Sequence, residues 1–246
     1  MRRLRPYLAL GLAVFVLAAV ASLPAALLSR GLPSRVTLEG VSGTLWDGAA
    51  TTLRLDGAAL GALDWTLSPW ALLRGTLAGQ VVLTRPDGHL NGHLVLHADG
   101  ALEASSLTLD LPLTTLHPEH DAKTWDGRIR GQVAYARLDL GWPVALQGHF
   151  DLLHLHAPQS PDDLGSFVLD FDPRDAKPTA LLGRLHDTGG PFSVTGQLRL
   201  EQSRAYQLDG DVAAHGVISE DLTRTLAFFG SPQPNGSRPF TITGTF

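Results

Sequence analysis

Residues 192–200 read FSVTGQLRL, and residues 206–214 read YQLDGDVAA. In both stretches, apolar residues or glycine alternate with polar residues, which is typical of a β-strand with one buried face. Four polar residues, 201–204, separate the two stretches, so together they predict an antiparallel hairpin. The predicted core side chains of this hairpin are Phe192, Val194, Leu198, Tyr206, Leu208 and Val212.

The same alternation continues through most of the chain after residue 30. It predicts further strands at 36–41, 50–56, 62–67, 76–84, 90–98, 105–113, 128–136, 144–152, 166–171 and 240–246, with Phe240 and Ile242 as core residues. Glycine recurs on the apolar side of several strands, which indicates bends or close backbone approach. We therefore expect an all-β region of curved antiparallel β-meander sheets.

Only two short helices are expected in this region. Residues 68–75, SPWALLRG, have a serine at the N-cap position, a proline at the first helical position and a closing glycine. Residues 219–229 begin with serine and two acidic residues and are followed by Gly230. Leu222, Leu226 and Phe229 would form the apolar side of this second helix.

The N-terminal segment differs from the rest of the chain. The 22 residues Tyr7–Leu28 contain no charge, and Arg2, Arg3 and Arg5 precede them. About 20 apolar residues span a bilayer, and the basic flank stays in the cytoplasm. This pattern predicts a cytoplasmic stub and transmembrane helix over residues 1–29, with a β-domain over residues 30–246 on the far side of the membrane.

A cleaved signal peptide is the alternative interpretation of this segment. Ala19-Val20-Ala21 fits the small-residue pattern of a cleavage site, and the basic residues in front fit the start of such a peptide. Apolar residues continue through Ala25-Ala26-Leu27-Leu28 beyond that site, which favours a retained single-pass anchor.

A weak internal repeat divides the β-region. Leu45-Trp46-Asp47-Gly48 returns as Thr124-Trp125-Asp126-Gly127, each followed by alternating residues. Residues 118–124 are the best boundary between two similar halves, although three matching residues also arise by chance.

Composition excludes several classes of function. The formal net charge of −5 argues against nucleic-acid binding, which needs a basic surface. The chain has no cysteine, so it has neither disulfides nor cysteine-based metal or redox sites. Neither a nucleophile elbow nor a P-loop nor a dinucleotide-binding fingerprint occurs. We expect no enzyme activity, no catalytic residue, no cofactor and no small-molecule substrate.

The histidines do not predict a metal site. His89, His93 and His97 would stack on a helix, but the alternating leucines place them on a strand. At about 3.3 Å per residue, the first and last would lie about 26 Å apart, too far for one metal ion. His154 and His156 share a face, whereas His149 has the opposite parity. Asp170, Asp172 and Asp175 lack the spacing of a calcium loop, so we expect no metal.

Trp46, Trp65 and Trp70 lie within 25 residues of one another. Two interpretations stay open for them. In the first, the indoles are core residues, because they bury large areas and need one partner for the N–H group. In the second, they form an exposed aromatic patch near the membrane that serves as a docking surface.

The chain resembles the type II secretion system protein N family (general secretion pathway protein N). A basic N-terminus and single apolar span precede residues 43–48, GTLWDG, which are similar to the family signature G-x-[VL]-W-x-G. Trp65, a turn at Pro69-Trp70, a Phe-Phe-Gly helix end at 228–230, and glycines 236 and 244 follow. The motif positions are Gly43, Leu45, Trp46, Gly48, Trp65, Pro69 and Trp70, and they have structural or docking roles.

The resemblance implies an accessory component of type II secretion that is anchored in the inner membrane and faces the periplasm. The implied partners are the inner-membrane platform subunits, the outer-membrane secretin and the membrane itself. An alternative comes from a similarity to AsmA-like, or bridge-type, membrane-anchored β-proteins: a curved sheet with an apolar concave face would handle lipid. A continuous open apolar groove would favour the alternative, and a filled core would favour the assembly role.

Overall fold

The computed structural model describes residue 15 and residues 18–115, 125–157, 162–174, 180–216, 222–223, 226 and 231–245. The chain divides into two compact units, Met1–Arg85 (unit 1) and Pro86–Phe246 (unit 2). The predicted boundary at 118–124 lies outside the described residues, as do residues 7–14, 16 and 17 of the predicted span at Tyr7–Leu28. Among the described residues, no helix has the length and apolar character that crossing a membrane requires.

Unit 1 is an antiparallel sheet with two short helical segments. Its elements are α2 (Ala26–Gly31), β1 (Val36–Glu39), β2 (Ser42–Gly43), β3 (Asp47–Leu55), β4 (Ala58–Leu67), η1 (Pro69–Arg74) and β5 (Thr76–Arg85). The strand order is β1-β3-β4-β5, and β2 pairs with the start of β3. The core of the unit consists of Ala25, Ala50 and Trp65, with Leu28, Leu38, Val41, Leu63 and Leu67 packed around them.

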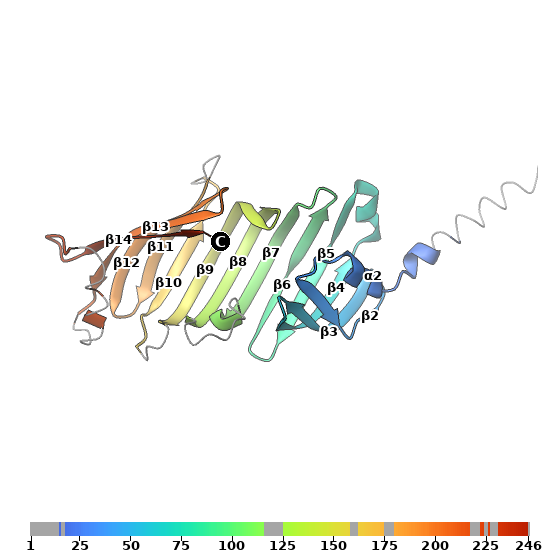
Figure 1. Cartoon of the computed structure of the whole chain (residues 1–246), viewed down its shortest axis with the longest axis horizontal. Coiled ribbons are helices and arrows are strands. Elements are labelled where there is room, and N and C mark those ends of the chain that lie inside the picture. Colours follow the sequence, from blue (N-terminus) through green and yellow to red (C-terminus); the bar gives the residue numbers. More distant parts are fainter. Residues whose placement is uncertain are drawn as a thin grey trace, which may run out of the picture. The chain divides into compact units, whose positions relative to one another are not determined.

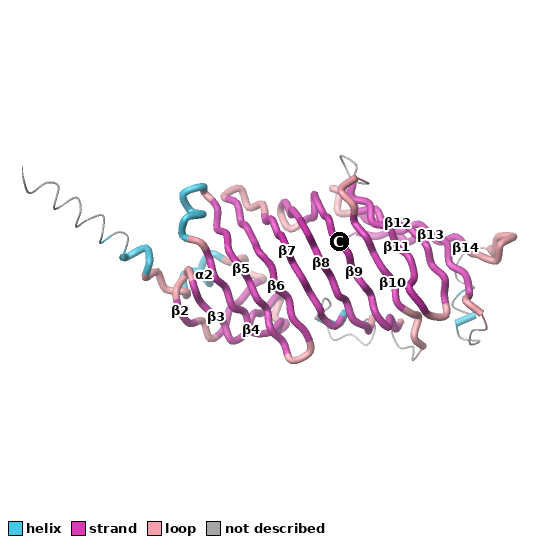
Figure 2. The backbone as a smooth tube through the Cα atoms, turned by 180° about the vertical axis from the view of Figure 1, so that it is seen from behind, coloured by secondary structure: helices cyan, strands magenta, loops and turns pink. Residues whose placement is uncertain are grey.

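Unit 2 is an antiparallel meander in which each strand pairs with the next. Its strands are β6 (Gly88–His97), β7 (Leu102–Pro112), β8 (Asp126–Asp139), β9 (Trp142–His156), β10 (Ser166–Phe171), β11 (Ala180–Gly189), β12 (Phe192–Glu201), β13 (Ala205–Ala214) and β14 (Arg238–Thr245), with a short 3-10 turn, η2 (Leu113–Thr115), after β7. Strands make up most of the described chain (Figures 1 and 2), which confirms the all-β prediction.

The hairpin predicted from residues 192–200 and 206–214 is present. In β12 and β13, Val194 pairs with Val212 and Leu198 with Leu208. Phe192, Val194 and Val212 are buried, together with Leu222 and Leu226 of the predicted second helix. Most of that helix lies outside the described residues, but these two leucines face the core as expected.

Two predictions for strands and core were wrong. The strand β11 was missed, because Ala180, Leu181, Leu182 and Gly183 are all buried and the segment therefore shows no alternation at its start. Ile242 was expected in the core but is 45% exposed. It lies on β14, which pairs only with β13 and ends the sheet of unit 2, so it is covered from one side only.

Glycines on the apolar side of unit 2 leave room for neighbouring rings. A Cβ atom added at Gly183 would lie 2.9 Å from the ring of Phe171, and one added at Gly210 would lie 2.8 Å from the ring of Phe240. Because these rings lie across the glycines, the close approach inferred from the sequence is confirmed. The same glycines allow the sheet to bend, and β13 and β14 lie at a wide angle to β8 in Figure 1.

A candidate docking site beside a tryptophan corner

The sequence around residues 43–48 forms a tight β2–β3 hairpin. Gly43 pairs with Gly48, and the backbone N–H of Thr44 donates to the carbonyl of Asp47 at 2.8 Å. Gly43 has a φ of +86°, which favours glycine, and a Cβ atom there would lie 2.5 Å from the carbonyl oxygen of Asp47. The first glycine of the motif is therefore required by the turn itself.

The second glycine of the motif lies against a tryptophan. Gly48 pairs across the strands with Trp65, and a Cβ atom at Gly48 would lie 2.5 Å from Cζ2 of that indole. The indole Nε1–H of Trp65 donates to the carbonyl of Leu45 at 3.1 Å. The side chain is 4% exposed, so Gly48 supplies the space for the ring and Leu45 supplies its hydrogen-bond acceptor.

Trp46 connects the same hairpin to the segment that precedes it. Its indole Nε1–H donates to the carbonyl of Val20 at 2.7 Å, and the residue is 7% exposed. The N–H of Leu45 donates to Leu23 at 2.8 Å, and the N–H of Ala25 donates to Gly43 at 3.2 Å. We refer to Gly43, Leu45, Trp46, Gly48 and Trp65 as the tryptophan corner. Residues 20–25 are hydrogen-bonded to it.

The Pro69–Arg74 turn is attached to this corner. The N–H of Leu67 donates to the carbonyl of Trp46 at 2.6 Å, and η1 begins two residues later. Pro69 occupies the first turn and Gly75 closes the helix in the left-handed conformation, as predicted. Ser68 makes no side-chain cap, and the helix is of the 3-10 type.

Most of the turn's apolar surface faces solvent. Trp70 is 73% exposed, Leu73 81% and Leu72 46%, whereas Ala71 is buried. The core interpretation is therefore correct for Trp46 and Trp65, whereas Trp70 is exposed, as the second interpretation requires. Its docking role near the membrane stays a prediction. Exposed apolar side chains that gather in one rigid turn are typical of a contact surface. We refer to Trp70, Leu72, Leu73 and Arg74 as the apolar turn.

The histidines considered as metal ligands lie where the sequence placed them. His89, His93 and His97 lie on β6. His89 pairs with Asp110 and His93 pairs with Ser105. Nε2 of His97 lies 3.3 Å from the carboxylate of Glu103. The Nδ1 atoms of His154 and His156 contact Asp163 and the carbonyl of His154, respectively. Among the described residues, which exclude Asp175, no group of three or more potential ligands gathers.

A charged cluster around His149 in unit 2 was not predicted from the sequence. His149 on β9 pairs with Asp170 on β10, its Nδ1 lies 2.7 Å from Asp170 Oδ1, and its Nε2 lies 3.3 Å from Asp151 Oδ1. The hydrogen bond to Asp170 is the main reason that the pKa of His149 is raised. Strand parity alone could not have found this pair, because it depends on the β9–β10 register.

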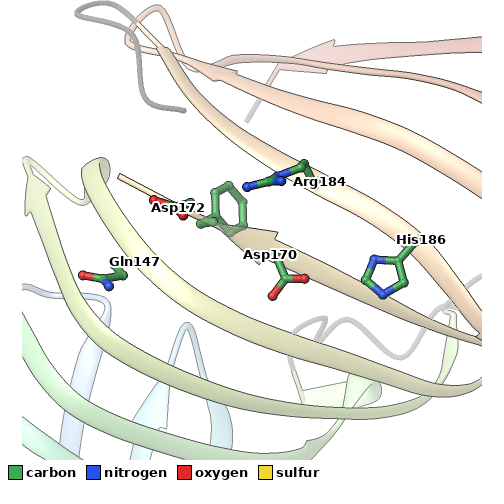
Figure 3. Close-up of a pocket in the computed structure, with 6 residues that line it drawn as sticks. Gln147, Asp170, Asp172, Arg184 and His186 are labelled. Atoms are coloured by element: carbon green, nitrogen blue, oxygen red, sulfur yellow. The ribbon is translucent and has the colours of Figure 1, made fainter. Parts of the chain in front are cut away.

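A pocket of about 380 Å³ lies beside this cluster (Figure 3). Its lining comes from β9 to β11 and consists of Gln147, Asp170, Phe171, Asp172, Arg184 and His186. The backbone N–H of Arg174 donates to the carboxylate of Asp172 at 2.9 Å. This hydrogen bond is the main reason that the pKa of Asp172 is lowered. The pocket is a solvated patch of paired charges on one side of the sheet.

Comparison with known proteins assigns the family. The model of the family "Type II secretion system (T2SS), protein N" matches residues 34–241, a range that contains the tryptophan corner from Gly43 onward and the apolar turn. The chain belongs to the type II secretion system protein N family. Membership of this family implies a component of the type II secretion system.

Two curated relatives agree with this assignment. The chain is 30% identical over 235 residues to a "Type II secretion system protein N" from Aeromonas hydrophila, covering 90% of both chains. It is 28% identical over 248 residues to a protein of the same name from Vibrio cholerae serotype O1, covering 94% of both. No solved structure matches the chain.

Proposed function

We propose that this protein is an accessory, non-catalytic assembly component of type II secretion, anchored in the inner membrane and facing the periplasm. The family assignment carries the proposal. It is supported by the uncharged stretch Tyr7–Leu28 behind three arginines, and by an exposed apolar turn without catalytic groups. The partners would be inner-membrane platform subunits, the secretin, or both, with no cofactor.

A deletion strain tests the role in secretion. Loss of the gene should leave folded secretion substrates in the periplasm, and the full chain supplied from a plasmid should restore export. Single replacements of surface charges such as His149→Gln should restore export fully, because an assembly role depends on contacts and not on a proton donor. Normal export in the deletion strain would contradict the proposal.

Membrane extraction and cross-linking test the anchor and the partners. The intact mass of the extracted protein should correspond to a chain that begins at its encoded N-terminus, and a mature chain starting at Ser22 would contradict the anchor. Cross-linking in membranes should capture a platform subunit or the secretin. Removal of the N-terminal span with periplasmic targeting retained should weaken export, because tethering raises the local concentration near the platform.

A second candidate function, lipid handling, is favoured by one feature of unit 2. A row of cross-strand neighbours runs from β6 to β14 on one side of the sheet and contains only apolar residues and glycine: Leu90, Leu109, Gly131, Phe150, Leu169, Leu185, Gly196, Gly210 and Phe240. Its leucines and phenylalanines are only half-buried. A continuous, incompletely covered apolar surface of this kind would suit an acyl chain.

Lipid analysis of the purified full chain separates the two candidates. Under lipid handling, phospholipid would copurify and Leu185→Gln, on the apolar side, would reduce it. His186→Gln, the next residue on the opposite side of β11, serves as the control. Bound phospholipid together with normal secretion in the deletion strain would replace the assembly role by lipid handling.

A further inference from the structure

The apolar turn lies next to the point where the N-terminal segment joins unit 1. The carbonyl of Val20 accepts the indole N–H of Trp46 at 2.7 Å, and the carbonyl of Trp46 accepts the N–H of Leu67 at 2.6 Å. Trp46 thus links Val20, which lies within the uncharged stretch Tyr7–Leu28, to the strand end from which the turn projects. Both features are therefore at the same end of β3 and β4.

The turn is held rigidly although its apolar side chains are exposed. Ala71 is buried beneath it, and the hydroxyl of Thr76 donates to the Ala71 carbonyl at 3.1 Å. The N–H of Gly75 donates to Leu72 at 3.0 Å and closes the turn. Because these hydrogen bonds hold the backbone of the turn, the exposure of Trp70 and Leu73 is a property of the folded structure. It does not depend on local unfolding of the turn.

The side chains of the turn match the interfacial layer of a phospholipid bilayer. Indole rings concentrate at the level of the headgroups, and leucine side chains are stable just below it. Residues 68–75 contain no acidic residue, and within the described part of the chain Arg74 forms neither an ion pair nor a side-chain hydrogen bond. A guanidinium group at that position can pair with lipid phosphate.

We propose that the apolar turn is a second membrane contact, in which Trp70, Leu72 and Leu73 enter the bilayer interface and Arg74 binds lipid phosphate. The proposal rests on the anchoring in the inner membrane proposed above. A bilayer is favoured over a protein partner because the turn is attached, through Trp46 and Val20, to the uncharged segment that we propose as the anchor. The N-terminal anchor and the apolar turn would then both contact the membrane at one end of unit 1. Together they would fix the orientation of this unit on the membrane, because a single anchoring helix leaves the unit free to rotate.

The experiment uses the full chain in phosphatidylethanolamine–phosphatidylglycerol vesicles. Since the chain has no cysteine, Leu73→Cys can be labelled at one site with an environment-sensitive fluorophore. Leu55→Cys is the matched control: it is an exposed leucine at the opposite end of β3 from the corner, about 26 Å away along the strand at about 3.3 Å per residue. Both labelled proteins are reconstituted in vesicles with and without nitroxide-labelled lipid.

The label at position 73 should shift its emission to the blue and be quenched several-fold more by shallow nitroxide lipids than the label at position 55. In the Trp70→Ser background this quenching should fall markedly, while the chain remains in the vesicles. Equal quenching at the two positions in a chain that floats with vesicles would overturn the membrane contact and leave the anchor intact. If the chain does not enter vesicles at all, the anchor fails, and the membrane contact fails with it. If the vesicles show no lipid quenching at position 73, and the same position cross-links to a platform subunit in native membranes, the membrane contact is overturned and the turn binds a protein partner instead.

Discussion

The tryptophan corner and the apolar turn lie close together in the sequence but differ in their exposure to solvent. Trp65 is 4% exposed and Trp70 is 73% exposed, although five positions separate them. The ring of Trp65 lies against Gly48 and its N–H has a carbonyl acceptor, and Trp46 has an acceptor in Val20. A tryptophan is thus buried where the fold provides both space and an acceptor, and is otherwise available for contacts outside the chain.

The strongest test of this difference removes each ring in turn. Trp65→Ala should lower the free energy of unfolding by about 3–5 kcal/mol, because it leaves a cavity in the core of unit 1. Trp70→Ala should change it by less than about 0.5 kcal/mol, because the ring is exposed. Chemical denaturation of the two variants in the same detergent measures both values. Equal losses of unfolding free energy in the two variants would mean that the ring of Trp70 is packed against the protein in solution.

A smaller effect is expected when the space beneath Trp65 is filled. Gly48→Ala should cost about 1–3 kcal/mol, since the new methyl group would overlap the indole and the carbonyl oxygens of Ser42 and Thr44. Gly31→Ala is the control, because nothing lies within 4 Å of its added Cβ atom. Thermal unfolding of both variants provides the comparison. If Gly48→Ala unfolds at the same temperature as the natural chain, the tryptophan corner can rearrange around the added methyl group.

The hydrogen bond between the corner and the N-terminal segment can be removed by replacing the indole with a smaller ring. Trp46→Phe should cost about 0.5–1.5 kcal/mol for the lost bond, together with the cost of the small cavity that the smaller ring leaves, and should speed hydrogen exchange of the amides in residues 22–25. Trp125→Phe, at an indole that is 46% exposed, serves as the control. Unchanged exchange in residues 22–25 would mean that the backbone bonds to Gly43 and Leu23 suffice to hold the segment.

The smallest effect is expected in unit 2, away from both regions. The pKa of His149 is raised, mainly by its hydrogen bond to Asp170, so the protonated ring stabilises the folded state. This contribution is fully present below the unfolded pKa of about 6.5 and is lost as pH rises through the higher folded pKa. The difference in unfolding free energy between the natural chain and His149→Gln should therefore shrink above neutral pH. It should stay below about 1 kcal/mol, since the histidine and its partners are partly exposed. A difference that grows with pH would contradict this assignment.

Much of the strand pattern was predictable from residue alternation, because one side of each strand is apolar and the other is polar. The hairpin at Phe192–Ala214 and the turn at Pro69–Gly75 were predicted close to their observed bounds. The strand β11 was not predicted, because its first four residues are all buried. This part of the strand therefore lacks the alternation of apolar and polar residues on which the prediction depends. Longer strands such as β8 were predicted too short, because register shifts near its two ends, after Asp126 and after Arg137, interrupt the alternation.

The β class, the positions of most turns and the family motif could be recognised from the sequence, because local periodicity, glycine and proline act through short-range geometry. Which tryptophans are buried depends on contacts between distant residues. Trp46 and Trp65 have acceptors 26 and 20 positions away, Trp65 also needs the space beside Gly48, and Trp70 has no such partner among the described residues. The pairing of His149 with Asp170 likewise required the strand register. Contacts between distant residues follow from how strands align in three dimensions, and alternation along a single strand carries no information about that alignment.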